Sequence, residues 1–459
     1  MSTMEKDVPA TPAGRKRWID HWDPEDPGFW EKTGRRVAFR NLWFSIFAEH
    51  IGFSIWVMWS VLVLFMGPEY GLTPADKFLL VALPNLVGSL LRVPYTFAVA
   101  MFGGRNWTII SAGLLLVPSI TAAVVLEPGV SYTTLLAVAT LAGFGGGNFA
   151  SSMANINTFY PNRLKGTALG LNAGGGNIGV AVVQLVGLLI IALAGTTAPR
   201  LLIGVYIPLI IVATLGAALF MDNLSSVRND TGAAKEALRD RQLWVMSFLY
   251  IGTFGSFIGY SFAFGLVLQN QFDRTPLQAA AVTFIGPLLG SLIRPVGGWL
   301  SDRINGSTVT FWNFIAMGAA SMLIIMAAGA ESLALFTIGF ITLFVLTGIG
   351  NGSTYKMIPS IFRAKADIAI AEGEDRDTAL ARSRRIAGAT IGIVSAVGAI
   401  GGFFINLAFR QSFLATGSGV VAFYSFLAFY VVCAVVTYLV YLRRVEVTAA
   451  KPRLVLEGV

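Results

Sequence analysis

Long apolar runs with few charged residues recur along this chain from about residue 38 to residue 444, and short polar segments separate them. A run of about 20 apolar residues forms a helix long enough to cross a hydrocarbon layer of roughly 30 Å. The runs do not alternate apolar and polar residues with a period of two, as the strands of an outer-membrane barrel do. The pattern therefore predicts an all-α membrane protein.

Twelve transmembrane helices are predicted, and a polar stretch after the sixth divides them into two bundles of six. The predicted helices are 38–66, 76–102, 106–126, 132–160, 164–194, 199–221, 242–270, 275–303, 307–329, 332–362, 384–411 and 419–444. The corresponding parts of the chain are a leader 1–37, a first bundle 38–221, a linker 222–241, a second bundle 242–444 and a tail 445–459.

Composition supports this class. Hydrophobic residues make up 55% of the chain and charged residues 13%, whereas soluble proteins carry about a quarter charged residues. With two His, one Cys and no phosphate-binding loop motif, we expect no metal site, no cofactor, no ATP-driven pumping and no enzyme activity. The first 37 residues are polar and do not resemble a cleavable signal peptide.

The positive charge is arranged as in a membrane protein. Most of the 33 Lys and Arg residues fall in the leader, the linker, the tail and alternate loops, so the positive-inside rule places both termini in the cytoplasm. The net charge of +8 is then explained by this topology. We therefore expect the lipid bilayer, and not nucleic acid, to be the macromolecular partner.

The two halves repeat each other. The sequence Gly-Ser-Leu-Leu-Arg at 88–92 recurs as Gly-Ser-Leu-Ile-Arg at 290–294, and the glycine-rich stretch 143–148 recurs at 348–352. Two parallel six-helix repeats are the plan of the major facilitator superfamily, whose substrate site lies near the midplane between the halves.

Two arginines are predicted to lie in the middle of the membrane. Arg92 and Arg294 are each about fourteen residues into a predicted helix, near the bilayer centre at about 1.5 Å per residue. An arginine there costs at least roughly 2.5 kcal/mol unless it has a partner. Either each pairs with a carboxylate on another helix, or both bind an anion. Glu49 alone at this depth cannot balance both, and two planar guanidinium forks suit a small planar oxyanion.

Aromatic and amide side chains accompany the arginines. Phe149, Tyr250 and Phe254 fall on helices expected to line the cavity. Two rings could enclose a flat ligand, although spacing alone favours ordinary packing. Asn172 and Asn177 lie within a predicted helix and each needs a partner in a bilayer, which is either the substrate or a neighbouring helix.

Three further ionisable groups are predicted within helices: Glu49, His50 and Lys356. Such groups can carry a proton together with an anion. The alternative, which we favour on the residues alone, is a static ion pair between Glu49 and Lys356 that gates the pathway.

Seven short motifs spread along the chain have the sequences of one transporter family: residues 22–30, 91–95, 102–105, 148–156, 168–172, 253–259 and 397–404. By these motifs the chain resembles the NarK-type nitrate/nitrite porters of the major facilitator superfamily. The resemblance implies that Arg92 and Arg294 bind the anion and that Phe149 and Phe254 stack on it. It also implies that Tyr250 and Asn177 form hydrogen bonds at the rim.

The resemblance further implies nitrate and nitrite as substrates and their antiport across the bacterial inner membrane, which would supply nitrate for reduction or assimilation. The alternatives are nitrate:proton symport through Glu49, His50 or Lys356, and a nitrate sensor that does not transport. Lys356 stands where some family members have glutamine. We expect a monomer.

Overall fold

The computed structural model describes residues 17–443, and helices form almost all of this range. The all-α prediction is therefore confirmed. One parallel ladder between β1 (Trp18–Ile19) and β2 (Asn223–Leu224) is the only sheet within the described range. Residues 1–16 of the predicted leader, residue 444 and the whole predicted tail 445–459 lie outside the described residues.

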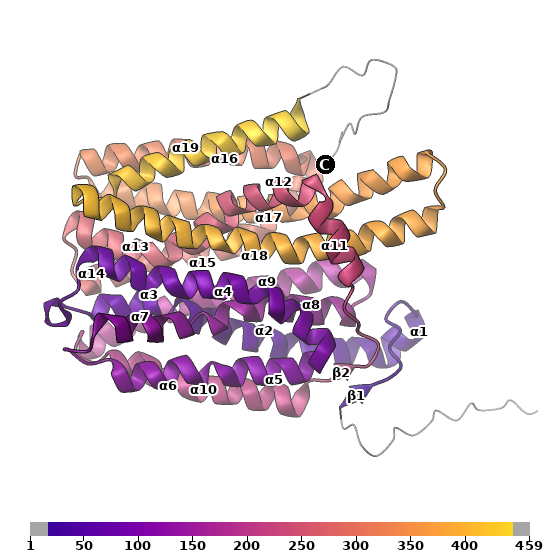
Figure 1. Ribbon diagram of the computed structural model, residues 1–459, viewed down its shortest axis with the longest axis horizontal. Coiled ribbons are helices and arrows are strands. Elements are labelled where there is room, and N and C mark those ends of the chain that lie inside the picture. The colour runs from indigo at the N-terminus through magenta and orange to yellow at the C-terminus, as the bar shows by residue number, and fades with distance from the viewer. Residues whose placement is uncertain (1–16, 444–459) are drawn as a thin grey trace, which may run out of the picture.

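The first half of the chain forms the lower group of helices in Figure 1, which run side by side. Three of its predicted helices, 38–66, 106–126 and 132–160, are each broken into two, and a π-helical turn at Trp30–Gly34 precedes the first. Its helices are α1 (Pro27–Phe29), α2 (Arg35–Val57), α3 (Trp59–Phe65), α4 (Pro74–Phe102), α5 (Gly104–Leu114), α6 (Leu116–Val125), α7 (Tyr132–Leu141), α8 (Phe144–Phe159), α9 (Asn162–Ala194) and α10 (Pro199–Phe220), with a 3₁₀ turn at Pro68–Tyr70.

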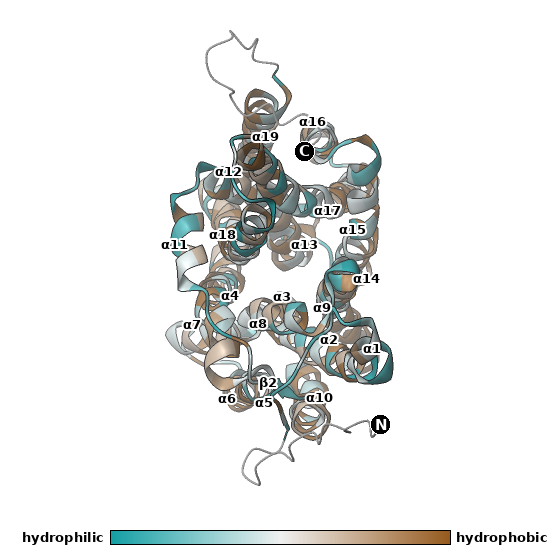
Figure 2. Cartoon of the chain, turned by 90° about the vertical axis from the view of Figure 1, so that its right-hand side faces the viewer, coloured by the Kyte–Doolittle hydropathy of each residue, from teal (hydrophilic) through white to brown (hydrophobic). Residues whose placement is uncertain are grey.

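The second half forms the upper group, and the two groups are also separate in the view along the helices (Figure 2). A short helix in the predicted linker, α11 (Thr231–Arg239), leads into it. The others are α12 (Arg241–Tyr250), a π-helical turn Ile251–Gly255, α13 (Ser256–Phe272), α14 (Pro276–Thr283), α15 (Ile285–Ile304), α16 (Gly306–Gly329), α17 (Leu333–Ala371), α18 (Arg376–Thr416), α19 (Val420–Thr437) and a π-helical turn Tyr438–Leu442.

Ten helices in the described range are long and apolar enough to cross a membrane, or eleven if the bent pair Pro27–Val57 and Trp59–Phe65 is one span. The predicted helix 132–160 is broken into α7 and α8, with 10 and 16 residues, and neither piece is long enough to cross alone. The number twelve therefore stays a prediction.

Two helices are longer than predicted. The predicted helix 332–362 continues to Ala371 as α17, and the predicted helix 384–411 runs from Arg376 to Thr416 as α18. The apolar run marks the part of a helix that lies in the membrane, whereas the hydrogen-bonded backbone continues into polar residues that project beyond it.

The repeat seen in the sequence is a repeat of helix contacts. On α8, a Cβ added to Gly146 would lie 2.6 Å from the Cα of Gly88 on α4. On α17, a Cβ added to Gly348 would lie 2.2 Å from the carbonyl oxygen of Gly290 on α15. Glycine is required at these positions because the two backbones touch, and the touching helices hold Arg92 and Arg294.

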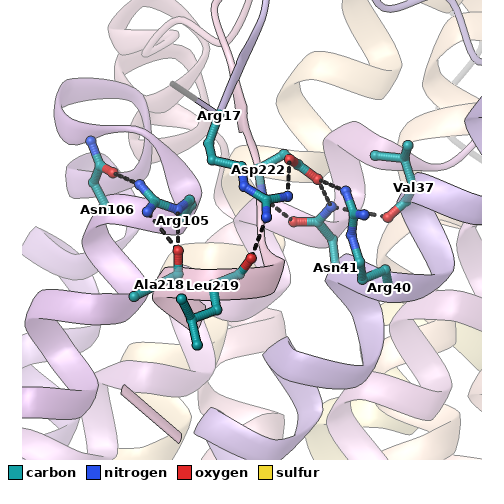
Figure 3. Close-up of polar contacts among 9 residues, drawn as sticks. All are labelled: Arg17, Val37, Arg40, Asn41, Arg105, Asn106, Ala218, Leu219 and Asp222. Carbon is teal, nitrogen blue, oxygen red and sulfur yellow. Dashed lines mark hydrogen bonds and ion pairs between the residues drawn. The ribbon is translucent and has the colours of Figure 1, made fainter. Parts of the chain in front are cut away.

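A polar cluster fastens the leader to one end of the first half (Figure 3). The buried carboxylate of Asp222, just after α10, accepts hydrogen bonds from Arg17 (3.5 Å), Arg40 (2.5 Å) and Asn41 (3.1 Å). Beside it, Nε of Arg105 donates a hydrogen bond to the backbone carbonyl of Ala218 near the end of α10 (3.2 Å). These contacts satisfy helix-end groups that would otherwise lack partners.

Candidate anion-binding site

Arg92 lies on α4 at the boundary between the two halves and has no exposed surface. Its Nε donates to the carbonyl of Gly146 on α8 (3.3 Å), and its Nη1 donates to the carbonyl of Ser395 on α18 (3.0 Å). Its Nη2 is buried and has no hydrogen-bond partner among the described residues. The ion pairs within residues 17–443 do not include Arg92.

Arg294 occupies the matching place on α15. Its Nη2 donates to the hydroxyl of Tyr250 on α12 (3.2 Å), and its guanidinium carbon lies 5.3 Å from the ring centre of Tyr355 on α17. Its Nη1 is buried and, like Nη2 of Arg92, has no partner in the part of the chain that the structure describes. Each arginine thus keeps one terminal nitrogen free, and neither pairs with a carboxylate there.

Three aromatic rings form a stack across the boundary. Phe149 of α8 faces Phe254 of the second half, with ring centres 6.4 Å apart and planes inclined by 28°. Tyr250 continues the stack, 5.3 Å from Phe254 and inclined by 9°. The guanidinium carbon of Arg92 lies 4.7 Å from the Phe149 ring centre and 4.9 Å from that of Phe254. The structure therefore brings Arg92, Phe149, Phe254, Tyr250 and Arg294 together at one place.

The π-helical turn Ile251–Gly255 explains how Phe254 reaches the stack. It interrupts the helix between α12 and α13, and such turns rotate the side chains that follow and occur often at functional sites. Gly255 allows the turn to approach α18, since a Cβ there would lie 2.8 Å from the carbonyl oxygen of Gly398. The sequence pattern predicts one continuous helix here and gives no sign of the turn.

The two asparagines of α9 have different surroundings. Asn172 donates to Oε2 of Glu49 (2.7 Å) and also contacts Ser152, so its partner is a neighbouring helix. The Oδ1 atom of Asn177 is buried and has no hydrogen-bond partner within residues 17–443. The Oδ1 atom of Asn172 is likewise buried without a partner there, so the two residues differ in that the amide nitrogen of Asn172 is bound to Glu49.

The expected ion pair between Glu49 and Lys356 is wrong. Lys356 lies 2.8 Å from Asp302 at the end of α15, and about half of each side chain is exposed. Glu49 is fully buried in the first half and accepts hydrogen bonds from Ser152 and Asn172. The prediction rested on depth along a helix, and depth does not specify the face from which a side chain projects.

His50 contacts the carbonyl of Gly175 on α9 through Nδ1 (3.1 Å).

A cavity of about 330 Å³ lies at the end of the molecule that carries α11, and its lining includes Val93, the neighbour of Arg92 in the chain. Its lining on α4 includes Val93 and Thr96, which follow Arg92 in the chain. Its lining on α18 includes Gly392, which lies about one turn before Ser395. The linker and the polar ends of α8 and α18 line the rest, including Arg384 and Arg385. Positive charge at this entrance would attract an anion toward the buried arginines.

Comparisons of the sequence with known proteins show the family. The sequence profile of the Major Facilitator Superfamily matches residues 42–405. The nitrate/nitrite transporter NarU of Salmonella typhimurium is 39% identical, over 93% of this chain and 96% of that protein. The chain belongs to the NarK-type branch of the Major Facilitator Superfamily. The probable nitrate/nitrite antiporter NarK2 of Thermus thermophilus is 33% identical over 90% of this chain and 94% of that protein.

Solved structures support the superfamily fold. The D-xylose-proton symporter superposes with a TM-score of 0.66 at 14% identity and covers 88% of this chain and 97% of its own. A bacterial homologue of the human lysosomal transporter Spinster, in an inward-facing and unoccupied conformation, gives 0.62 at 15% identity, covering 89% and 97%. At these identities the likeness concerns the fold alone. In this superfamily the site lies between the two repeats, which is where Arg92 and Arg294 lie.

Sequence reasoning missed several contributors to the site. Tyr355 contacts Arg294, and Trp56 lies 5.3 Å from the guanidinium carbon of Arg92. Tyr355 directly precedes Lys356 and lies three residues after the glycine-rich stretch 348–352, so the sequence indicates its neighbourhood. The carbonyls of Gly146 and Ser395 have no side-chain signature, and only the fold shows that Arg92 reaches them.

Proposed function

We propose that this multi-pass membrane protein carries nitrate and nitrite across the bacterial inner membrane by exchanging one for the other. The observation that carries the proposal is the pair of buried, unpartnered guanidinium nitrogens, Nη2 of Arg92 and Nη1 of Arg294. Buried donors without partners are costly, and a donor that stays charged requires an anion. The names of the similar transporters, NarU and NarK2, supply nitrate and nitrite as the anions.

The shape of the site favours a small planar oxyanion. The rings of Phe149 and Phe254 are 6.4 Å apart and nearly parallel, close to the separation of roughly 7 Å that a flat ligand between two carbon faces requires. Nitrate and nitrite are planar and present several oxygen acceptors to guanidinium forks. Asn177 and Tyr250 would complete the hydrogen bonds at the rim.

The arrangement of the halves supports alternating access. Arg92 and Phe149 belong to the first half, and Arg294, Tyr250 and Phe254 belong to the second. A rocking motion of one half against the other would therefore open the site between the two arginines to one side of the membrane at a time. We place α11, the leader and both termini in the cytoplasm by the positive-inside rule, and we propose that the carrier acts as a monomer.

Exchange in proteoliposomes tests the proposal. Vesicles loaded with nitrite should take up labelled nitrate without a pH gradient, because the exchange of two monovalent anions moves no net charge. Vesicles loaded with chloride should take up little. Uptake that occurs only under an imposed proton gradient would favour proton symport, for which the buried carboxylate of Glu49 is the candidate. Binding of nitrate without any counterflow would indicate a sensor.

A further inference from the structure

The boundary between the two halves continues beyond Arg92 along α4 and α18, which lie side by side (Figure 1). Its contacts recur after seven residues, or about two helical turns. Arg92 on α4 is bound to Ser395 on α18. Seven residues earlier on α4 and seven later on α18, a Cβ added to Gly402 would lie 2.4 Å from Nδ2 of Asn85. Both contacts therefore belong to one seam, defined here as the facing sides of α4 and α18.

Aromatic rings close this seam at the end remote from α11, which we call the outer end. Phe78 of α4 stacks on Phe409 of α18, with ring centres 5.5 Å apart, and on Phe413 at 5.3 Å. Phe78 and Phe409 have no exposed surface. At the opposite end of the seam, Thr96 and Gly392 line the cavity beside α11. The two halves are thus in contact at the outer end and leave a cavity at the other.

Asn85 lies in the closed part of the seam and its side chain is left without hydrogen bonds. It has no exposed surface, and neither Nδ2 nor Oδ1 has a partner within the described residues. The carbonyl of Gly402 accepts a hydrogen bond from Asn406 instead (2.8 Å). The hydroxyl of Ser89 donates to the backbone carbonyl of Asn85 and not to its amide (2.8 Å). Buried polar side chains are nearly always bonded, so this one requires an explanation.

The place of Asn85 on a boundary that must open supplies the explanation. A buried amide that has given up its hydrogen bonds to water without replacing them raises the free energy of the conformation that buries it. When the halves separate at the outer end, water reaches the amide and the cost disappears. Gln184 of α9 shows the opposite case, because its Nε2 donates across the boundary to the carbonyl of Ser261 on α13 (2.8 Å) and stabilises the closed contact.

We infer that Asn85 sets the conformational balance of the transport cycle by destabilising the state in which the outer end is closed. The inference rests on alternating access in the proposed function and adds a residue that this function uses without touching the anion. The hydrogen bonds Arg92–Ser395 and Gln184–Ser261 hold the halves together. The unpaired amide opposes them, so a carrier that must pass through both states is not trapped in the closed one.

The accessibility of a thiol measures this balance. Cys433→Ser removes the single native cysteine. Ala82→Cys then places a thiol on α4 between Phe78 and Asn85, at a position with no exposed surface in the closed seam. A membrane-impermeant maleimide added outside right-side-out membrane vesicles reaches this thiol only when the outer end opens. The initial rate of labelling therefore reports the population of the open state.

Substitutions at Asn85 should move this rate in opposite directions. Asn85→Ala and Asn85→Leu both remove the unpaired amide, although the first reduces the volume of the side chain and the second increases it. Each should shift the equilibrium about tenfold toward the closed state, as expected for one unsatisfied polar group, and slow labelling by up to that factor. Asn85→Asp keeps the shape and is more costly to bury, so it should be labelled faster.

Asn313→Leu is the matched control. A Cβ on Gly350 of α17 would lie 2.7 Å from Nδ2 of Asn313 on α16, so this buried amide also packs against a glycine. Both helices belong to the second half, and their contact does not cross the boundary. Labelling should keep the parental rate in this variant. A reduction equal to that of Asn85→Leu would overturn the inference, because any buried amide would then have the same effect.

The opposite signs keep the test decisive if one variant fails to fold. Labelling of Asn85→Ala and Asn85→Leu at or above the parental rate overturns the inference, and so does slower labelling of Asn85→Asp. Because labelling requires no substrate, it is independent of the exchange assay. Absence of nitrite-driven nitrate uptake by the unaltered protein would contradict the proposed function, whereas the labelling rates would still decide the role of Asn85.

Discussion

Arg92 on α4 donates a hydrogen bond of 3.0 Å from Nη1 to the backbone carbonyl of Ser395 on α18, so a side chain of one half is bound to the main chain of the other. The same guanidinium keeps Nη2 buried and without a partner in the described chain. Because α4 and α18 belong to different halves, rocking must break this hydrogen bond. Arg92 is thus part of both the proposed anion site and the contact between the halves.

The guanidinium fork at this place should not be replaceable by an ammonium group. Arg92→Lys and Arg294→Lys keep the charge but lose the parallel donors. We expect each to weaken nitrate binding by at least about tenfold, or about 1.4 kcal/mol. The half-saturation concentration for nitrate in proteoliposome exchange measures this. Arg200→Lys is the matched control, because Arg200 lies in an exposed ion pair with Glu127 (2.6 Å) away from the site. Near-normal affinity in both site variants would contradict bidentate binding.

The aromatic pair should contribute through its flat faces. Phe254→Leu keeps most of the apolar volume but removes the ring that faces Phe149 at 6.4 Å. Such ring contacts contribute about 0.5–1.5 kcal/mol beyond buried area, so we expect nitrate affinity to fall about three- to tenfold. Phe254→Tyr should retain most of it.

Phe264→Leu is the control for this prediction. It breaks a closer stacked ring pair, whose other ring is that of Phe340 at 4.2 Å, at a place apart from the arginines. It should lower thermal stability and leave the nitrate affinity unchanged. Equal effects of Phe254→Leu and Phe264→Leu on affinity would show that the ring of Phe254 acts only through packing.

The arginines could be predicted from the sequence because burying a charge in a membrane demands a partner, whatever the fold. The glycine repeat could also be predicted, because Gly88 and Gly290 stand at the same distance before Arg92 and Arg294 in the two halves. The partners of Arg92 could not, because backbone carbonyls such as that of Ser395 depend on how the halves dock. The placement of Lys356 was wrong because depth along a helix does not specify the face, and side chains about half a turn apart project from opposite sides of the helix.

The close contact between α2 and α8 predicts a sharp difference between two glycines. A Cβ on Gly145 would lie 2.1 Å from the carbonyl oxygen of Gly52, whereas a Cβ on Gly170 would meet no atom within 4 Å. Gly145→Ala must push the two backbones apart, so we expect a loss of roughly 1–3 kcal/mol, as for overpacking. Gly170→Ala should be neutral or stabilising by up to about 1 kcal/mol. Thermal unfolding in detergent compares them, and equal melting temperatures would contradict the observed contact.

The linker between the halves is held by charge at its short helix. Asn229 donates to the carbonyl of Phe97 on α4 (3.1 Å), and the next residue, Asp230, accepts hydrogen bonds from Nε (2.5 Å) and Nη2 (2.9 Å) of Arg385 on α18. Adjacent residues of the linker thus contact both halves. Asp230 also caps α11 through the backbone N–H of Ala233 (2.8 Å).

The pH dependence of this contact follows from its charges. The hydrogen bonds from Arg385 lower the pKa of Asp230 from 3.8 to about 2. A lowered pKa gives a contribution that is present above the ordinary pKa and is lost as the pH falls through about 2. We therefore expect the Asp230–Arg385 contact to persist unchanged from neutral pH to about pH 5. Hydrogen exchange of the α11 amides, corrected for the intrinsic pH dependence, should show the same protection at both values.

Substitution should remove that protection without removing the helix cap. Asp230→Asn keeps a good N-cap residue but loses the charge, and Arg385→Gln loses its partner. Both ends of the pair are about half exposed, so the effect should be a few-fold faster exchange of α11 and not global unfolding. The double variant should exchange no faster than either single variant, because each removes the same interaction. Asp367→Asn, which breaks the exposed pair with Arg363, serves as the control and should leave α11 unchanged. Strictly additive effects of the two substitutions would show that Asp230 and Arg385 act independently.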